Sequence, residues 1–67
     1  MKNAKITRLI EIRRLNGLSQ EAAAALFGVS KSYYIKVETG HCKAGRGFIE
    51  RFRVLYPKED INIFFAA

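Results

Sequence analysis

The sequence predicts an all-α domain of four helices, with a fifth element of uncertain form near the C-terminus. Apolar residues recur at steps of three and four in residues 5–16 and again in residues 48–56, which is the spacing of amphipathic helices. Between these segments lie two short helical patterns on either side of a tight turn at residues 27–30. A chain of 67 residues without a repeat predicts one domain over residues 1–67.

The first two helices are each marked by local signals at their ends. Gly17 follows the first helix, expected over residues 5–16, and is a natural left-handed terminator. Ser19 is a favourable N-cap for the second helix, which runs through the alanine block of residues 22–25, the best helix former available. Gly28 can adopt the positive φ of the turn that ends it without steric cost.

The third helix is expected over residues 31–38, with Ser30 as its N-cap. Two short helices joined by a turn that contains glycine are the layout of a helix-turn-helix, which reads DNA with its second helix. Residues 41–47 contain glycines and cations without periodicity, which predicts a loop. The fourth helix is expected over residues 48–56, because Pro57 disfavours helix at the residue before it.

The C-terminal tail permits two interpretations. Asp60 could cap a short fifth helix, whereas Ile61, Ile63 and Phe65 alternate as the residues of a strand would. So short a run cannot be assigned from its period alone.

Composition narrows the function classes. The net charge of +6 attracts polyanions. A single cysteine, Cys42, excludes an intrachain disulfide and suits a reducing cytoplasm. Cys42 and the lone His41 are too few ligands for a structural zinc site, so we expect no metal and no cofactor. The longest uncharged run, residues 22–30, is far shorter than a membrane span. The sequence has no Ser/His/Asp or Cys/His set with the partners that catalysis needs, so we expect no enzyme.

The sequence resembles the Cro/repressor class of helix-turn-helix domains, also called the xenobiotic-response-element (XRE) class, of phage and bacterial regulators. The matching residues are Ile12-Arg13, Gly17-Leu18-Ser19-Gln20-Glu21, Ala24, Phe27-Gly28-Val29-Ser30, Val37-Glu38 and Gly40. The resemblance implies a five-helix, lambda-repressor-like fold whose third helix enters the major groove. It also implies a structural ion pair between Arg13 and Glu38. A carboxylate at a helix C-terminus opposes the macrodipole, so a compensating cation is expected on physical grounds as well.

The chain departs from the usual pattern of this class in its predicted core. Ala23 stands where leucine is usual, and Tyr34 stands where isoleucine or valine is usual. We hypothesise that the ring of Tyr34 fills the volume vacated at Ala23, because a core tolerates exchanges that keep its total volume.

The N-terminal turn of the third helix and the face one turn later are expected to meet base edges. The predicted base-contacting residues are Lys31, Ser32, Ile35 and Lys36. Lysine donates to guanine O6 and N7, and serine can donate or accept. Outside this motif such lysines would be read as a solvated surface, and Ile35 could contact a thymine methyl or lie against its own subunit.

Residues around both helices are predicted to contact the DNA backbone. They are Ser19, Gln20, Tyr33, Thr39, Lys43 and Arg46. The side-chain amide of Gln20 and the free N–H groups near it could hold a phosphate, whereas capping is the more natural role of Ser19. Tyr33 could stack on the sugar-phosphate backbone or shield the core.

The resulting interpretation is a sequence-specific regulator that binds a double-stranded DNA operator as a homodimer. A dimer interface is expected in the tail, residues 58–67, through Ile61, Ile63, Phe64 and Phe65, because so many large apolar groups are costly to leave in water. With no effector domain in view, we expect a small Cro-like repressor of phage or mobile-element type, with no small-molecule substrate. The alternative is a protein-protein interaction adaptor that uses the apolar tail as its contact surface.

Overall fold

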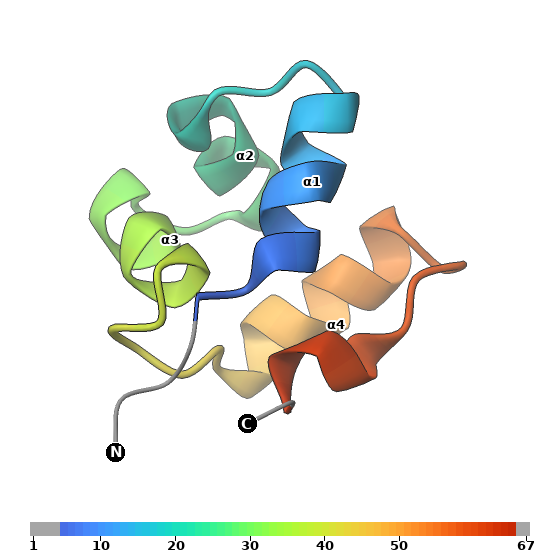
Figure 1. The fold of residues 1–67 in the computed structure, drawn as a ribbon. Helices are drawn as coiled ribbons and strands as arrows, with labels where there is room; N and C mark the ends of the chain where they lie inside the picture. The colour runs from blue at the N-terminus through green and yellow to red at the C-terminus, as the bar shows by residue number, and fades with distance from the viewer. Residues whose placement is uncertain (1–4, 66–67) are drawn as a thin grey trace.

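The computed structural model describes residues 5–65 and confirms the predicted all-α fold, with no strand among these residues. The elements are α1 (Thr7–Leu15), α2 (Gln20–Phe27), α3 (Lys31–Glu38), α4 (Arg46–Leu55) and the 3₁₀-helix η1 (Ile61–Phe64). In Figure 1, α2 packs against α3 and η1 packs against α4, while α1 lies between these two pairs. Helices α2 and α3, with the turn between them, form the predicted helix-turn-helix.

The ends of these two helices are fixed by the residues that the sequence indicates. The Ser19 hydroxyl accepts a hydrogen bond from the Ala22 N–H at 3.0 Å. The Ser30 hydroxyl accepts one from the Tyr33 N–H at 3.1 Å. Gly28 ends α2 in the left-handed conformation, with φ of 68°, which is open to glycine at no steric cost. Local backbone chemistry therefore sets where α2 begins and ends and where α3 begins.

The core is built around four aromatic rings, those of Phe27, Tyr34, Phe48 and Phe52. Phe27 stacks on Phe48 with ring centroids 4.3 Å apart. The ring of Tyr34 lies 5.8 Å from Phe27 and is fully buried, as is that of Phe52. Ala23 is buried in the same core. A small and a large residue thus occupy the core as hypothesised, and the compensation of volume between them stays a prediction.

Two helix boundaries differ from expectation. Helix α1 begins at Thr7 rather than at Lys5, because the N–H of Ile6 donates to the Glu38 carbonyl at 3.0 Å and Ile6 is the N-cap. Helix α4 begins at Arg46, because the extended Gly45 is its N-cap. The loop after α3 is therefore shorter than predicted and ends at Gly45.

The tail forms a helix, so the strand alternative is wrong for residues 61–64. The Asp60 side chain accepts a hydrogen bond from the Asn62 N–H at 2.9 Å and so caps η1. In a 3₁₀-helix, residues three apart lie on one side, which turns both Ile61 and Phe64 toward the core. The ring of Phe64 meets Phe52 edge-on, with centroids 4.9 Å apart.

This packing bears on the predicted dimer interface, which stays a prediction. Ile61, Ile63 and Phe64 are half-buried against the core of their own chain. Only Phe65 among the four is largely exposed, at 64%. The apolar tail chiefly completes a small core, because a domain of this size buries only about 60% of its unfolded surface without such additions.

Candidate nucleic-acid interface

Helix α3 has a buried face and an open face. The buried face consists of Tyr34, Val37 and Glu38. Lys31, Ser32 and Lys36 are exposed, and Ile35 is half-buried. The four residues predicted to contact bases are thus on α3 and outside its buried face, so none of them is consumed by the core.

Helices α3 and α4 both begin with a cation. Lys31 and Arg46 are the first residues of these helices, and neither helix has an acidic residue in its first turn. By contrast, α2 has Glu21 there, as the helix macrodipole favours. A cation near a helix N-terminus adds to the positive end of the dipole. Both helix starts therefore attract anions such as phosphate.

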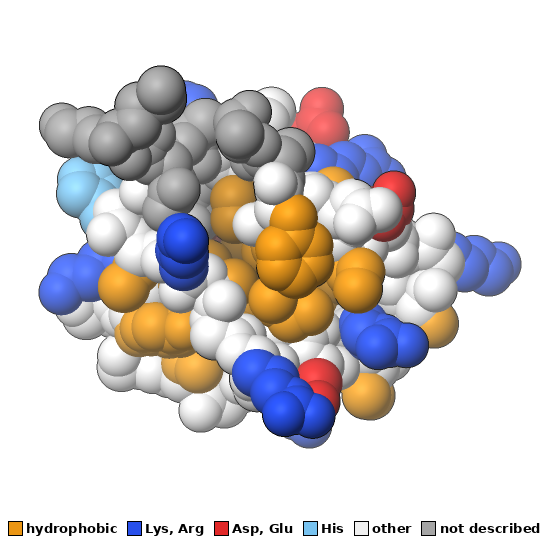
Figure 2. Space-filling view, turned by 90° about the horizontal axis from the view of Figure 1, so that it is seen from below, with side chains coloured by type: hydrophobic (Ala, Val, Ile, Leu, Met, Phe, Trp, Pro, Cys, Tyr) orange, Lys and Arg blue, Asp and Glu red, His pale blue; other side chains and the backbone are white. Residues whose placement is uncertain are grey.

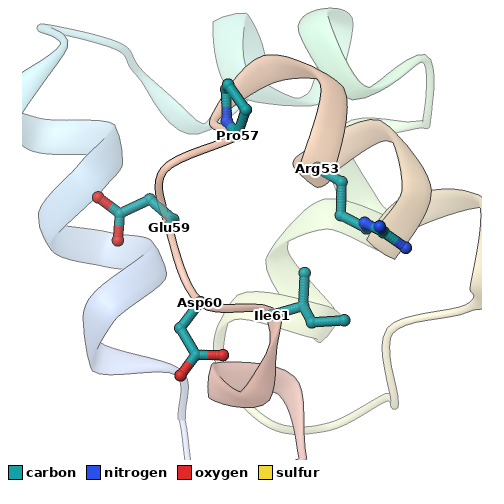
Figure 3. Close-up of a pocket in the computed structure, with 5 residues that line it drawn as sticks. All are labelled: Arg53, Pro57, Glu59, Asp60 and Ile61. Atoms are coloured by element: carbon teal, nitrogen blue, oxygen red, sulfur yellow. The ribbon is translucent and has the colours of Figure 1, made fainter.

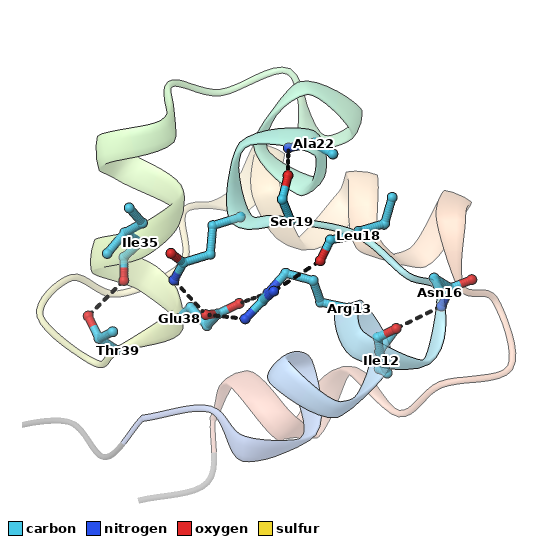
Figure 4. Close-up of polar contacts among 10 residues, drawn as sticks. Ile12, Arg13, Asn16, Leu18, Ser19, Ala22, Ile35, Glu38 and Thr39 are labelled. Carbon is cyan, nitrogen blue, oxygen red and sulfur yellow. Dashed lines mark hydrogen bonds and ion pairs between the residues drawn. The ribbon is translucent and has the colours of Figure 1, made fainter.

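Glu38 holds the C-terminal end of α3 to the rest of the domain (Figure 4). The predicted ion pair is present: Arg13 Nε donates to Glu38 Oε2 at 2.8 Å, and its terminal nitrogen donates to Oε1 at 3.3 Å. Another Arg13 nitrogen donates to the Leu18 carbonyl at 3.0 Å. Burial alone raises the pKa of Glu38, but hydrogen bonds from Arg13 and Gln20 outweigh it and hold that pKa below its usual value. The carboxylate therefore stays charged although it is buried.

The side chain of Gln20 serves this ion pair. Its Nε2 donates to Glu38 Oε1 at 3.0 Å. This hydrogen bond gives the amide a role within the domain, and the phosphate contact expected of Gln20 stays a prediction. At this end of α2, an anion can also meet the backbone N–H groups of the first turn. The hydroxyl of Ser19 is exposed there and accepts a hydrogen bond as the N-cap.

The chain leaves α3 through a tightly bonded turn. The Thr39 hydroxyl donates to the Ile35 carbonyl at 2.7 Å and lies 2.9 Å from His41 Nδ1. The N–H groups of His41 and Cys42 both donate to the Lys36 carbonyl, at 2.8 and 3.1 Å. The hydroxyl proton of Thr39 is thus donated within the domain, and the contact of Thr39 with the DNA backbone stays a prediction.

Tyr33 shields the core, one of the two roles expected for it. Its half-buried ring meets Phe48 edge-on, with centroids 6.1 Å apart. Its hydroxyl accepts a hydrogen bond from the Gly45 N–H at 2.9 Å. Tyr33 thus joins α3 to the start of α4.

The two cationic side chains that are predicted to contact phosphates are both exposed to water. Lys43 is exposed in the loop between α3 and α4. The side chain of Arg46 is 93% exposed, and its Nε lies 3.3 Å from Oε1 of Glu50, one turn later in α4. A pair so exposed contributes little to stability, so the guanidinium of Arg46 can exchange Glu50 for another anion at small cost.

A shallow pocket lies between the end of α4 and the segment that leads to η1 (Figure 3). Its lining residues are Arg53, Pro57, Glu59, Asp60 and Ile61. Both carboxylates there are engaged, since Glu59 pairs with Arg8 and Asp60 caps η1. The pocket belongs to neither helix of the helix-turn-helix.

Two contacts of the domain were not predicted from the sequence. Arg8 and Glu59 form a second forked ion pair. Tyr33 bonds the backbone of Gly45 rather than any side chain. Neither contact has a local signal, because the partners are 51 and 12 residues apart.

Among residues 5–65, no cluster of His, Cys, Asp or Glu could hold a metal ion. No helix in the same part of the chain is long and apolar enough to cross a membrane.

The arrangement of α2 and α3, with an open basic face on the second helix, defines a helix-turn-helix DNA-binding domain. A helix-turn-helix family model matches residues 9–44, more than half of the chain. The chain therefore belongs to the helix-turn-helix family of Cro/XRE type, with its all-α, lambda-repressor-like fold, and this is a family of DNA-binding transcriptional regulators rather than of enzymes. Searches of curated proteins and of solved structures gave no match.

Proposed function

We propose that this regulator reads a specific operator by inserting α3 into the major groove, and that it acts as a homodimer. The observation that carries the proposal is the exposure of Lys31, Ser32 and Lys36 on a helix whose other face is fixed by the core and by Glu38. A helix held in this way can present side chains to base edges without losing much conformational freedom on binding.

The proposed base contacts follow from the chemistry of each side chain. Lys31 and Lys36 donate to guanine O6 and N7, and Ser32 donates or accepts. Ile35 is half-buried, and its exposed part offers an apolar contact to a thymine methyl. We expect an operator with guanines in each half-site.

The proposed phosphate contacts flank the base-reading face. Lys43 and Arg46 follow α3 in the chain and are exposed. Ser19 and the backbone at Gln20 begin α2, where free N–H groups favour a phosphate. Contacts of this kind set the register of the protein on the duplex and supply most of the affinity that depends on salt.

A homodimer is supported by the size of the module and by its remaining apolar surface. One helix-turn-helix covers about half of a typical operator, and two copies bind half-sites about one turn of DNA apart. Figure 2 shows apolar side chains in the middle of the lower face of Figure 1, with lysines and arginines on several sides of them. We place the dimer contact in the tail, residues 58–67, with Phe65 as its exposed anchor. Residues 1–67 then act as one domain.

The proposed effect on transcription is repression. A dimer that occupies an operator blocks polymerase by occupying its path, and this requires nothing beyond DNA binding. The resemblance to Cro-type regulators of phages and mobile elements points the same way. A reporter gene can be placed behind an operator that is selected for binding to this chain. Its expression should decrease when the chain is produced in the same cells.

The decisive experiment is selection of bound sequences from a random duplex pool, followed by titration of the matched and a scrambled duplex. Lys36→Ala should weaken binding to the matched duplex by about 1–3 kcal/mol and relax the preference at one base pair. Arg53→Ala removes the same charge from the pocket side of α4 and is the matched control. Equal losses for both variants would contradict base reading by Lys36.

The dimer needs its own test. Phe65→Ser should convert the dimer into a monomer in sedimentation, because it removes the one largely exposed tail aromatic without touching the core. Val54→Ser changes a similarly exposed apolar residue on α4 and should leave the dimer intact. A dimer that survives Phe65→Ser would refute this placement.

The alternative function is a protein-protein adaptor, and the exposed Phe65 is the observation in its favour. The two readings differ at low salt. A DNA reader binds duplexes there and prefers its operator, whereas an adaptor ignores every duplex.

A further inference from the structure

Tyr33 lies on α3, next in the chain to Ser32, which we propose to contact bases. Its ring is half-buried against Phe48, which is in the first turn of α4. Its hydroxyl oxygen is 2.9 Å from the backbone nitrogen of Gly45 and accepts that N–H. One side chain therefore fixes the start of α4 relative to the recognition helix through both packing and a hydrogen bond.

The hydrogen bond completes an N-cap that the local sequence cannot complete. Gly45 is the N-cap of α4 and has no side chain to offer. In a capping box, a Glu or Gln at the third helical position accepts the N-cap N–H, but that position here is Phe48. The Tyr33 hydroxyl takes this role from another helix. The approach is close: a Cβ on Gly45 would lie 3.2 Å from the hydroxyl oxygen.

The loop between α3 and α4 is thereby bonded at both ends. At its start, Thr39, His41 and Cys42 bond to the carbonyls of the last turns of α3. At its end, Gly45 bonds to Tyr33. Lys43 lies between these anchors, and Arg46 follows the second directly.

We propose that Tyr33 is a positioning residue for DNA binding, which holds Lys43 and Arg46 at a fixed place relative to the base-reading face of α3. The inference rests on the proposed function and deepens it. Phosphates on one strand have a fixed spacing, so cations on an ordered loop meet them with less loss of conformational freedom than cations on a loose one. Tyr33 acts through these two cations and touches no DNA.

The test is Tyr33→Phe, which keeps the ring on Phe48 and removes only the hydroxyl. Affinity should fall about three- to tenfold for the matched and the scrambled duplex alike, the size expected for one lost hydrogen bond. The slope of log K against log salt should flatten by about one unit. The ratio of matched to scrambled affinity should not change. Tyr56→Phe removes a hydroxyl at the far end of α4 and should leave the affinity and the slope unchanged.

Two further measurements separate positioning from the other roles of a tyrosine. In a chain that already carries Lys43→Ala and Arg46→Ala, Tyr33→Phe should cause no further loss of affinity. Loss that persists there would show direct contact between the hydroxyl and DNA and would overturn the proposal. Hydrogen exchange of the Gly45 amide should accelerate in Tyr33→Phe while the melting temperature stays well above the binding temperature.

The failure of this inference can be told from the failure of the proposed function. If the unaltered chain binds no duplex at low salt, both the proposed function and the positioning role of Tyr33 are refuted. If it binds, and Tyr33→Phe binds with the same affinity and salt slope, only the positioning role is refuted. A loss confined to the matched duplex would also refute it, because that result assigns Tyr33 to base reading.

Discussion

The domain contains two arginine-glutamate pairs of nearly the same geometry in different surroundings. In both, the Nε and a terminal nitrogen of arginine bond the two carboxylate oxygens, at 2.8 and 3.3 Å for Arg13–Glu38 and at 3.0 and 2.8 Å for Arg8–Glu59. The side chains of the first pair are 14% and 2% exposed, whereas those of the second are 43% and 25% exposed. The fork geometry is therefore shared, and burial is what differs.

The two pairs also connect different parts of the chain. Arg13–Glu38 joins α1 to the end of α3 and includes Gln20 of α2, so it fixes the whole helix-turn-helix (Figure 4). Arg8–Glu59 fastens the segment before η1 to the first turn of α1. A buried charge that loses its partner is strongly destabilising, whereas an exposed one is solvated by water. The buried pair thus contributes most to the stability of α3 in its place, and the exposed pair contributes a smaller amount to the attachment of the tail.

The largest expected effect is that of Arg13→Ala. It leaves the Glu38 carboxylate buried without its main partner, which costs about 3–5 kcal/mol in the free energy of unfolding. The total free energy of unfolding of a domain is about 5–15 kcal/mol. A large fraction of the Arg13→Ala molecules should therefore be unfolded at 37 °C. Urea denaturation followed by circular dichroism measures the loss. Arg14→Ala, at an exposed neighbouring position, is the control, and an equal loss for both variants would refute the role of burial.

The next effect is acid sensitivity. Hydrogen bonds from Arg13 and Gln20 overcome burial and keep the pKa of Glu38 low, and the hydrogen bond from Arg8 lowers the pKa of Glu59. A carboxylate whose folded pKa lies below its unfolded pKa contributes stability that is present above the unfolded value, about 4.3, and is lost as pH falls through the folded pKa. Stability should therefore be flat near pH 7 and fall below about pH 5.

Substitution by glutamine assigns this acid loss to one pair or the other. Glu38→Gln cannot titrate, so its stability should start lower at pH 7 and lose much less on acidification. Glu59→Gln should retain most of the acid loss of the unaltered chain. Urea midpoints between pH 7 and pH 3 give both curves. The reverse order of the two variants would mean that the exposed pair carries the linkage.

Local backbone chemistry explains why much of the fold could be predicted from the sequence. Ser19 and Ser30 cap helices through N–H groups three residues later, so the donor and the acceptor lie within one readable stretch. Gly28 is left-handed at the turn that its spacing marks. The Arg13–Glu38 pair is 25 residues apart and was predicted through the family resemblance and the helix dipole together.

Contacts that depend on the final packing could not be predicted in this way. Tyr33 and Gly45 meet only because α4 starts beside α3, and Gln20 turns inward only because Glu38 is buried beside it. The form of the tail was ambiguous because so short a run does not establish a period. The structure shows a helix there, in which Phe64 packs on Phe52. The base and phosphate contacts remain predictions, since they concern a partner.

A smaller effect is expected from Arg8→Ala. The melting temperature should fall only slightly, because both partners of this pair reach water and an exposed pair is worth little. The difference from the unaltered chain should vanish in about 1 M NaCl, where the Debye length is about 3 Å. Differential scanning calorimetry at low and high salt measures it. A difference that persists in high salt would show that Arg8–Glu59 behaves as a buried pair.

The smallest effect is expected from Tyr34→Phe. This variant tests whether the Tyr34 hydroxyl takes part in the buried Arg13–Glu38 interaction. Tyr34 is one turn before Glu38, and its buried hydroxyl has no hydrogen-bond partner among residues 5–65. Removing an unsatisfied buried group is neutral or stabilising, so the urea midpoint should stay the same or rise. If the hydroxyl instead donated to the Glu38 carboxylate, the loss would be about 1.5–3 kcal/mol. Tyr34→Ala, which also removes the ring, should cost about 3–5 kcal/mol, so the two variants separate the hydroxyl from the packing.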